Sequence, residues 1–164
     1  MVKEMLNQYA AYNVWANQKM VDTLLALPVS LLQQKVASNF PSLYLTLGHM
    51  WYAENVWWQR IKLTETVQPI NVEKYKVAEL ASGLMLQSKM WEEWVLKSTE
   101  AALQHEFIYR NSKKELFKQP VFQVLLHLFN HQTYHRGQLV TIMRSLNIDK
   151  IPATDFIEYS RGRK

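Results

Sequence analysis

Apolar side chains recur at every third or fourth position in four long segments of the chain, a spacing that predicts amphipathic helices. These segments cover about residues 3–27, 41–62, 73–102 and 120–145. Pro28 cannot continue the first helix, whereas Pro41 and Pro120 favour the starts of the second and fourth, and Ser38 or Asn39 is available to cap the second. The fourth helix has the clearest apolar face, which consists of Val121, Leu125, Leu128, Leu139, Ile142 and Leu146.

The remaining segments predict connections rather than further long helices. Residues 105–119 contain two short apolar runs around a polar turn, which favours a small hairpin or an irregular crossover. The tail, 148–164, contains Pro152 and is expected to be extended. We therefore predict an all-α fold: a single domain over residues 1–164, built as a four-helix bundle with a long irregular crossover before the last helix.

Composition narrows the classes of protein to which the chain can belong. It has no cysteine, which excludes disulfides, zinc fingers and thiolate nucleophiles and fits a reducing compartment, so we expect a cytoplasmic protein. We expect neither a signal peptide nor a membrane span, because no apolar stretch is long enough. The net charge is +5, but Arg161, Arg163 and Lys164 account for three of those charges, so neither a nucleic-acid nor a membrane partner is expected.

Three of the five histidines stand at every fourth position in the segment HLFNHQTYHRG, residues 127–137. His131 and His135 are about 40° apart around a helix and about 6 Å apart along its axis, so they project from the same side. His135 also continues the apolar face. In the second helix, His49 shares a face with Leu45, Tyr52 and Val56. Two facing helices of a bundle would therefore bring three imidazoles together.

These three histidines predict a site for a divalent metal ion. Imidazole is a good ligand for zinc, nickel, copper and iron, and three protein ligands leave a coordination position open, as in catalytic sites. The uncompensated charge of the ion would attract hydroxide, a carboxylate or a substrate thiolate. The alternative is that each histidine is a hydrogen-bonded core residue. A ferritin-like di-iron site is excluded, because the chain contains no Glu-x-x-His motif.

Two other histidines fall outside this group. His127 is about 80° from His135 around the helix and about 12 Å away along its axis, too far for one ion to bind all three histidines of the last helix. We expect it behind a metal ligand, facing the substrate, or in a structural role. His105 is expected to be exposed. Gly48, next to His49, would let a neighbouring element approach closely.

With these residues in place, the chain resembles the DinB-like superfamily of four-helix metalloproteins over nearly its whole length. The resemblance rests on LHLFNHQTYHRGQL (126–139), which contains the NHxxxHRGQ pattern of the family's closing helix, and on LTLGHMWYAENVWW (45–58) and YNVWANQKM (12–20). It implies a bundle that binds a divalent metal, zinc or nickel in many members, through His49, His131 and His135. It also implies a homodimer.

The resemblance further implies a type of reaction. Characterised branches of the superfamily include thiol-dependent S-transferases and a maleylpyruvate isomerase, in which the metal activates a low-molecular-weight thiol. We therefore expect a metal-dependent S-transferase that acts on a small-molecule substrate with such a thiol as co-substrate. The alternatives are a non-enzymatic metal- or ligand-binding stress-response protein and a metal-dependent hydrolase. Hydrolysis is disfavoured because Glu54, five residues after His49, lies about 140° away around the helix.

Four residues are candidates for contacting the substrate or supporting the metal ligands: His127, Tyr52, Gln138 and Arg136. Tyr52 either reaches the open coordination position or packs in the core. Gln138 either orients a metal ligand or substrate or makes an ordinary polar contact, and Arg136 either forms a surface ion pair or clamps an anion.

Two further features concern packing. Gly137, which follows Arg136 in the HRG pattern, is expected to permit close helix packing. Trp57 and Trp58 are adjacent and cannot both face one core, so one of them is expected at a dimer interface or an apolar cleft.

Overall fold

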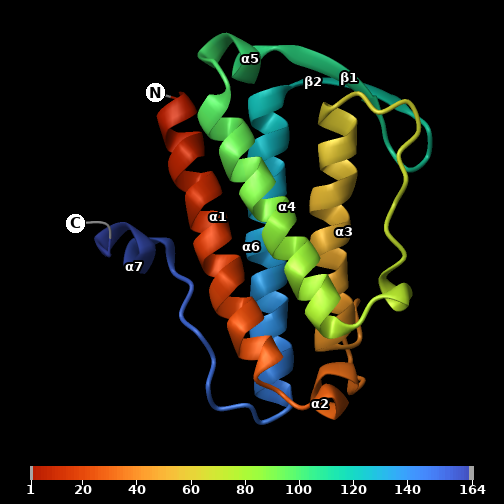
Figure 1. Ribbon diagram of the computed structural model, residues 1–164, viewed down its shortest axis with the longest axis vertical. Coiled ribbons are helices and arrows are strands. Elements are labelled where there is room, and N and C mark those ends of the chain that lie inside the picture. The colour runs from red at the N-terminus through yellow and green to blue at the C-terminus, as the bar shows by residue number, and fades with distance from the viewer. Residues whose placement is uncertain (1, 163–164) are drawn as a thin grey trace.

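The computed structural model describes residues 2–162 and contains four long helices, joined by shorter elements (Figure 1). The long helices are α1 (Val2–Leu25), α3 (Leu43–Ile61), α4 (Val77–Lys97) and α6 (Val121–Ser145). Helices α1 and α3 each pack against both α4 and α6. The first two long helices, α1 and α3, therefore lie at diagonal positions of the bundle. The predicted four-helix bundle is confirmed.

The two long connections differ in form. Helices α3 and α4 run in the same direction, so residues 62–76, which include the 3₁₀ turn η1 (Val72–Lys74), return along the outside of the bundle (Figure 1). The connection before α6 consists of α5 (Glu100–Gln104) and an antiparallel hairpin of β1 (Glu106–Arg110) and β2 (Leu116–Pro120). Of the two forms expected for residues 105–119, the hairpin is the one observed.

Several helix boundaries differ from those predicted. Helix α3 begins at Leu43 because the Ser42 side chain accepts a hydrogen bond from the backbone N–H of Leu45; the expected cap at Ser38 or Asn39 is wrong. Residues 73–102 form η1, α4 and α5 rather than one helix. The short helix α2 (Val29–Gln33) was not predicted.

The tail is also not extended throughout, as was expected. It ends in α7 (Phe156–Arg161), where Phe156 and Tyr159 make ring contacts with Tyr12 of α1, and Tyr159 also contacts Trp15. Aromatic burial against α1 therefore stabilises a helix in the tail. Two of the three basic residues assigned to the tail, Arg163 and Lys164, lie outside the described residues.

The core contains two large hydrophobic clusters with polar residues between them, and a small third cluster of Tyr12, Ala16 and Tyr159 where the tail meets α1. One large cluster contains Leu47, Leu84 and Ile142, and the other large cluster contains Leu6, Trp91 and Leu125. Buried polar residues of all four long helices occupy the level between the clusters, and we call them the polar layer: Asn13, Asn17, Glu54, Ser88, Gln132, His135 and Arg136.

Close packing holds the outer connection against α3. A Cβ at Gly48 would overlap the side chain of Val72 in η1, which confirms the expected close approach at this glycine. Within residues 2–162, no helix combines the length and the apolar character needed to cross a membrane.

Candidate metal centre

Three histidine side chains from two helices meet at the edge of the polar layer. The Nε2 atom of His131 lies 3.2 Å from Nε2 of His49 and 3.0 Å from Nε2 of His135. One ring nitrogen from each histidine can be chosen so that all three lie within 4.8 Å of one another. The structure thus brings together the three residues that the sequence selected.

This spacing suits a metal ion. Nitrogen ligands at 2.0–2.1 Å from a tetrahedral zinc ion lie about 3.3 Å from one another, close to the two Nε2 distances of His131. Within residues 2–162, the buried Nδ1 atom of His131 has no hydrogen-bond partner, and the other ring nitrogen contacts the neighbouring imidazoles. The three rings can hold a divalent ion with at least one position open to a further ligand.

The electrostatic surroundings keep these imidazoles neutral. Burial, followed by the nearby His135, lowers the pKa of His49 to about 4. Burial and the neighbouring histidines lower the pKa of His131 to about 3, and burial also lowers the pKa of His135. Neutral imidazole is the form that binds metal, so the site need not release protons at pH 7.

Gln138 fixes the orientation of the His135 ring. Its Oε1 lies 2.7 Å from Nδ1 of His135, while its Nε2 donates to the hydroxyl of Tyr134 at 3.1 Å. Because the Gln138 oxygen can only accept, Nδ1 of His135 carries the proton and Nε2 presents its lone pair to the centre. Of the two roles expected for Gln138, the structure shows the contact with a candidate ligand.

Two aromatic side chains stack on the ring of His49. Phe40 stacks on its ring at a centroid distance of 4.1 Å and meets the edge of His135 at 5.6 Å. Tyr52 stacks on His49 at 6.0 Å. Sequence reasoning missed Phe40, because it lies in the irregular segment before α3 and helical spacing says nothing about where such a residue points.

His127 lies beside the centre without joining it. Its ring centroid is 5.9 Å from that of His131, and it packs edge-on against Trp57. The side chain is exposed in part, and partial burial of its ring, followed by the nearby cation of Arg60, lowers the pKa of His127. It therefore stands outside the three-histidine group, as the helical geometry predicts. His105 is exposed, also as expected.

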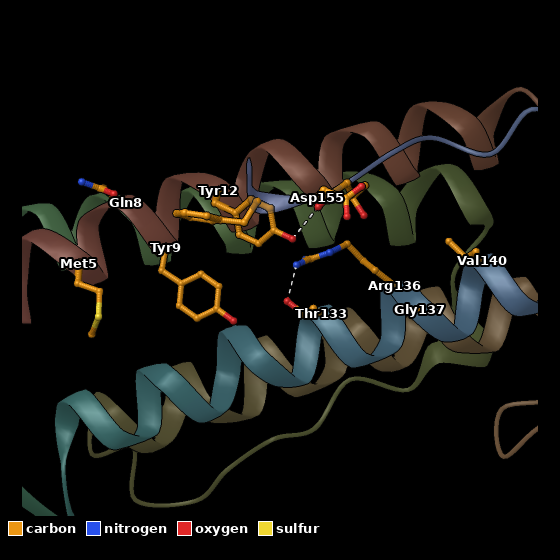
Figure 2. A pocket seen from close by; sticks show the side chains of 11 residues that line it. Met5, Gln8, Tyr9, Tyr12, Thr133, Arg136, Gly137, Val140 and Asp155 are labelled. Carbon is orange, nitrogen blue, oxygen red and sulfur yellow. Dashed lines mark hydrogen bonds between the residues drawn. The ribbon is translucent and has the colours of Figure 1, made fainter. Parts of the chain in front are cut away.

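Arg136 is buried, so the expectation that it forms a surface ion pair is wrong: the residue is 1% exposed. Its Nη1 donates to the Oδ1 atoms of Asn13 and Asn17, and its Nη2 donates to Thr133. Figure 2 shows the guanidinium between Thr133 and Tyr12, at the wall of a cavity of about 640 Å³ between α1, α6 and the tail. Whether Arg136 contacts a substrate stays a prediction.

The carboxyl group of Glu54 faces this arginine network rather than the histidines. Asn13 Nδ2 donates to its Oε1 at 2.9 Å, and the Ser88 hydroxyl lies 3.0 and 2.8 Å from its two oxygens. Burial raises the pKa of Glu54 to about 7, against the opposing effects of Asn13, Ser88 and Arg136. Within residues 2–162, the candidate metal group contains histidines and no carboxylate.

Gly137 does not serve close helix packing, which corrects that expectation. A Cβ at this position would meet no atom within 4 Å, and the residue lines cavities on both sides of α6.

Trp57 and Trp58 are both partly buried. Trp58 packs edge-on against Trp91, and Trp57 packs edge-on against Tyr109.

Comparison with known proteins identifies the family of this chain. The model of the DinB family matches residues 1–162. The chain belongs to the DinB family. It is similar to Protein DinB of Bacillus subtilis (strain 168), with 28% identity over 152 residues that cover 88% of this chain and 87% of that protein.

Two solved structures share the fold of this DinB-family chain. One is YfiT from Bacillus subtilis, which is described as a probable metal-dependent hydrolase with an unusual four-helix bundle topology. Its TM-score is 0.70 at 13% identity, and the aligned region covers 88% of this chain and 89% of the YfiT chain. A DinB-like protein from Bacillus cereus ATCC 10987 has a TM-score of 0.68 at 22% identity, with 92% and 95% covered.

Proposed function

We propose that this DinB-family protein is a metal-dependent S-transferase, which joins a low-molecular-weight thiol to an electrophilic small molecule. His49, His131 and His135 would hold one divalent ion, zinc or nickel. The observation that carries the proposal is the convergence of three imidazoles, with pKa values lowered by burial, from two helices. The description of YfiT as a probable metal-dependent hydrolase supports metal dependence.

The absence of a carboxylate favours thiol transfer over hydrolysis. Within the described part of the chain, the metal group consists of histidines, and Glu54 is held in the core by Asn13 and Ser88. A bound divalent ion supplies positive charge that favours the thiolate form of a sulfur ligand, so a thiol needs no strong base. Activation of water usually uses a carboxylate base near the metal.

The side chains around the centre supply orientation and a proton acceptor. Gln138 holds the His135 ring, and the rings of Phe40 and Tyr52 hold His49. His127 has a lowered pKa and is exposed, so it can accept the thiol proton at neutral pH and release it to solvent. The sulfur then forms a bond to the electrophilic carbon, and the leaving group departs with the electrons of the bond that breaks.

Metal content tests the site directly. The purified protein, loaded with zinc or with nickel and desalted, is expected to retain about one ion per chain, and His49→Ala, His131→Ala and His135→Ala are each expected to lose it. His105→Ala replaces an exposed histidine outside the group and provides the matched control. Equal metal retention in all four variants would contradict the proposal that these three histidines bind the ion.

Turnover separates the candidate functions. We expect the metal-loaded protein to accelerate conjugation of 1-chloro-2,4-dinitrobenzene to at least one of L-cysteine, glutathione and 2-mercaptoethanol, with chloride released, and the His131→Ala variant to lose this rate. A hydrolase is the second candidate, favoured by the description of YfiT, and would instead cleave 4-nitrophenyl acetate without a thiol. Stoichiometric metal without either reaction would favour the non-enzymatic binding protein.

A homodimer and a cytoplasmic location stay predictions. Sedimentation velocity at micromolar concentration tests the first, and a monomer there would contradict it.

A further inference from the structure

Another cavity, of about 650 Å³, adjoins the candidate metal centre. It lies between the C-terminal half of α3, the segment 63–69 and the β1–β2 hairpin. Figure 1 shows the hairpin and the outer connection beside the same end of α3. Tyr52 lines this cavity and also stacks on the ring of His49, so this side chain connects the cavity wall to the histidine group.

Arg60 lies in this cavity without an anionic partner. Its guanidinium carbon is 4.6 Å from the ring centroid of Trp57 and 5.7 Å from that of Tyr109, so two aromatic rings position the cation. Within residues 2–162, no protein acceptor forms a hydrogen bond or ion pair with its guanidinium, and its buried Nε has no partner. A partly buried cation without a counter-ion favours the binding of an oxyanion.

The remaining lining adds positive charge and an apolar wall. Arg110 and Lys114 of the hairpin also line the cavity, against one acidic residue, Glu65. Between Arg60 and the metal centre, the wall is formed by Val56 and Tyr52, which precede Arg60 by four and eight residues on one face of α3. The cavity therefore offers a cationic end and an apolar path toward the histidines.

The spacing along α3 sets the length of the ligand. Arg60 follows His49 by eleven residues, which corresponds to about 16 Å along the helix axis. Both side chains lean toward the helix N-terminus, the longer arginine further than the histidine, so the gap between the guanidinium and the metal centre is shorter than this rise and on the order of 10 Å. A short acid such as acetate cannot span this gap, whereas a chain of about six carbons can.

We propose that this cavity binds the acidic end of a substrate: an elongated organic acid whose carboxylate pairs with Arg60, whose apolar body lies along Val56 and Tyr52, and whose reactive end reaches the histidine centre. This inference rests on the proposed function for the reactive end only. Carboxylate binding at Arg60 requires no metal, so the two proposals can fail separately. Arginine suits this role because its planar fork binds carboxylates through two parallel hydrogen bonds.

Metal-free protein tests the carboxylate site with three probes: hexanoate, its neutral counterpart hexanamide, and acetate. The readout is the Nε–H NMR signal of Arg60, assigned by its loss in Arg60→Gln. Hexanoate is expected to shift this signal, with at least tenfold tighter binding than either hexanamide or acetate. Arg60→Gln should weaken hexanoate binding at least tenfold, Arg60→Lys should restore part of it, and Arg144→Gln, which replaces an exposed arginine of α6, should change it less than twofold.

Three results would overturn the proposal: equal affinity for hexanoate and hexanamide, equal affinity for hexanoate and acetate, or an unchanged affinity in Arg60→Gln. The two probe comparisons need no mutation, so a poorly folded variant does not leave the question open. Zinc-loaded protein then tests the link to the centre. There 6-mercaptohexanoate is expected to bind at least tenfold more tightly than hexanoate, and His131→Ala should remove this gain.

Discussion

Replacing Glu54 by glutamine tests the ionisation of the polar layer. Glu54 is fully buried, and burial raises its pKa from 4.5 to about 7 despite the hydrogen bonds from Asn13 and Ser88. Glutamine keeps an oxygen that accepts from Asn13 and gains an N–H group that can donate to the Ser88 hydroxyl. The substitution therefore removes the titration while it retains the shape and most of the hydrogen bonds.

The magnitude follows from the two pKa values. Because the folded-state pKa lies above the unfolded one, the contribution of the Glu54 proton to stability is complete below pH 4.5 and is lost as the pH rises through about 7. At 1.36 kcal/mol per pKa unit, this interval corresponds to about 3 kcal/mol. The Glu54→Gln variant has no such proton, so its stability relative to the wild type should rise by about 3 kcal/mol between pH 4.5 and 8. For a chain of this length, that is a relative gain of about 6–12 °C in Tm.

Urea unfolding of the metal-free wild type and variant at pH 5, 6, 7 and 8 measures this change, because the titration of the histidines is common to both proteins and cancels in the difference. Glu4→Gln, at an exposed carboxylate of α1, is the matched control for the loss of one carboxylate. A constant difference for Glu54→Gln, or a wild type that gains relative stability as the pH rises, would refute the reasoning. Either result would mean that Arg136 and the donors of the network keep Glu54 ionised throughout.

Three further predictions follow from the structure. Gln138→Ala should weaken zinc binding about 10- to 100-fold, because His135 loses the acceptor that orients its ring. A competition titration with a chelator measures this affinity, and Gln123→Ala, at an exposed position of α6, should leave it unchanged. Gly137→Ala should raise the free energy of unfolding by about 0.5–1 kcal/mol, since a methyl group there meets no neighbour and alanine favours the helix; a loss of stability in urea unfolding would contradict this. The metal-free protein should lose stability as the pH falls from about 6.5 toward 4, because His49 and His131 take up protons in the unfolded chain at a higher pH than in the folded one. Thermal unfolding at a series of pH values measures this loss, and His131→Asn should make it smaller.

The three-histidine group was predictable because helical geometry and the predicted packing of the bundle together determine it. Residues four apart share a face, so His131 and His135 had to point the same way, and their continuity with the apolar stripe directed them inward. His49 lay on the equivalent face of α3. Phe40 and the helix α7 were missed because their positions depend on tertiary contacts: Phe40 packs on His49 from an irregular segment, and α7 is held by rings of α1. Amphipathic periodicity contains no information about such contacts.

The polar layer was missed for a different reason. A polar residue on an amphipathic helix is normally taken to face solvent, and this led to the surface position expected for Arg136. The sequence nevertheless contained a signal, because Arg136 lies seven residues after Phe129 and seven before Met143, both of which are fully buried. A charged residue in the middle of a buried stripe predicts a buried partner, and Asn13 and Asn17 on α1 supply the acceptors.

The position of this layer beside the histidines determines what kind of ligand the centre favours. At pH 7 the three histidines are neutral and Arg136 is cationic, while burial raises the pKa of Glu54 and favours its neutral form, so the level of the centre tends toward positive charge before any ion binds. A divalent ion held by three neutral ligands adds two further charges that no protein carboxylate in the described group offsets. Arg60, Arg110 and Lys114 extend the same sign along the adjoining cavity. The cavity lining thus carries more positive than negative charge, with Glu65 as its one acidic residue, and we propose that an anionic substrate supplies negative charge at both ends.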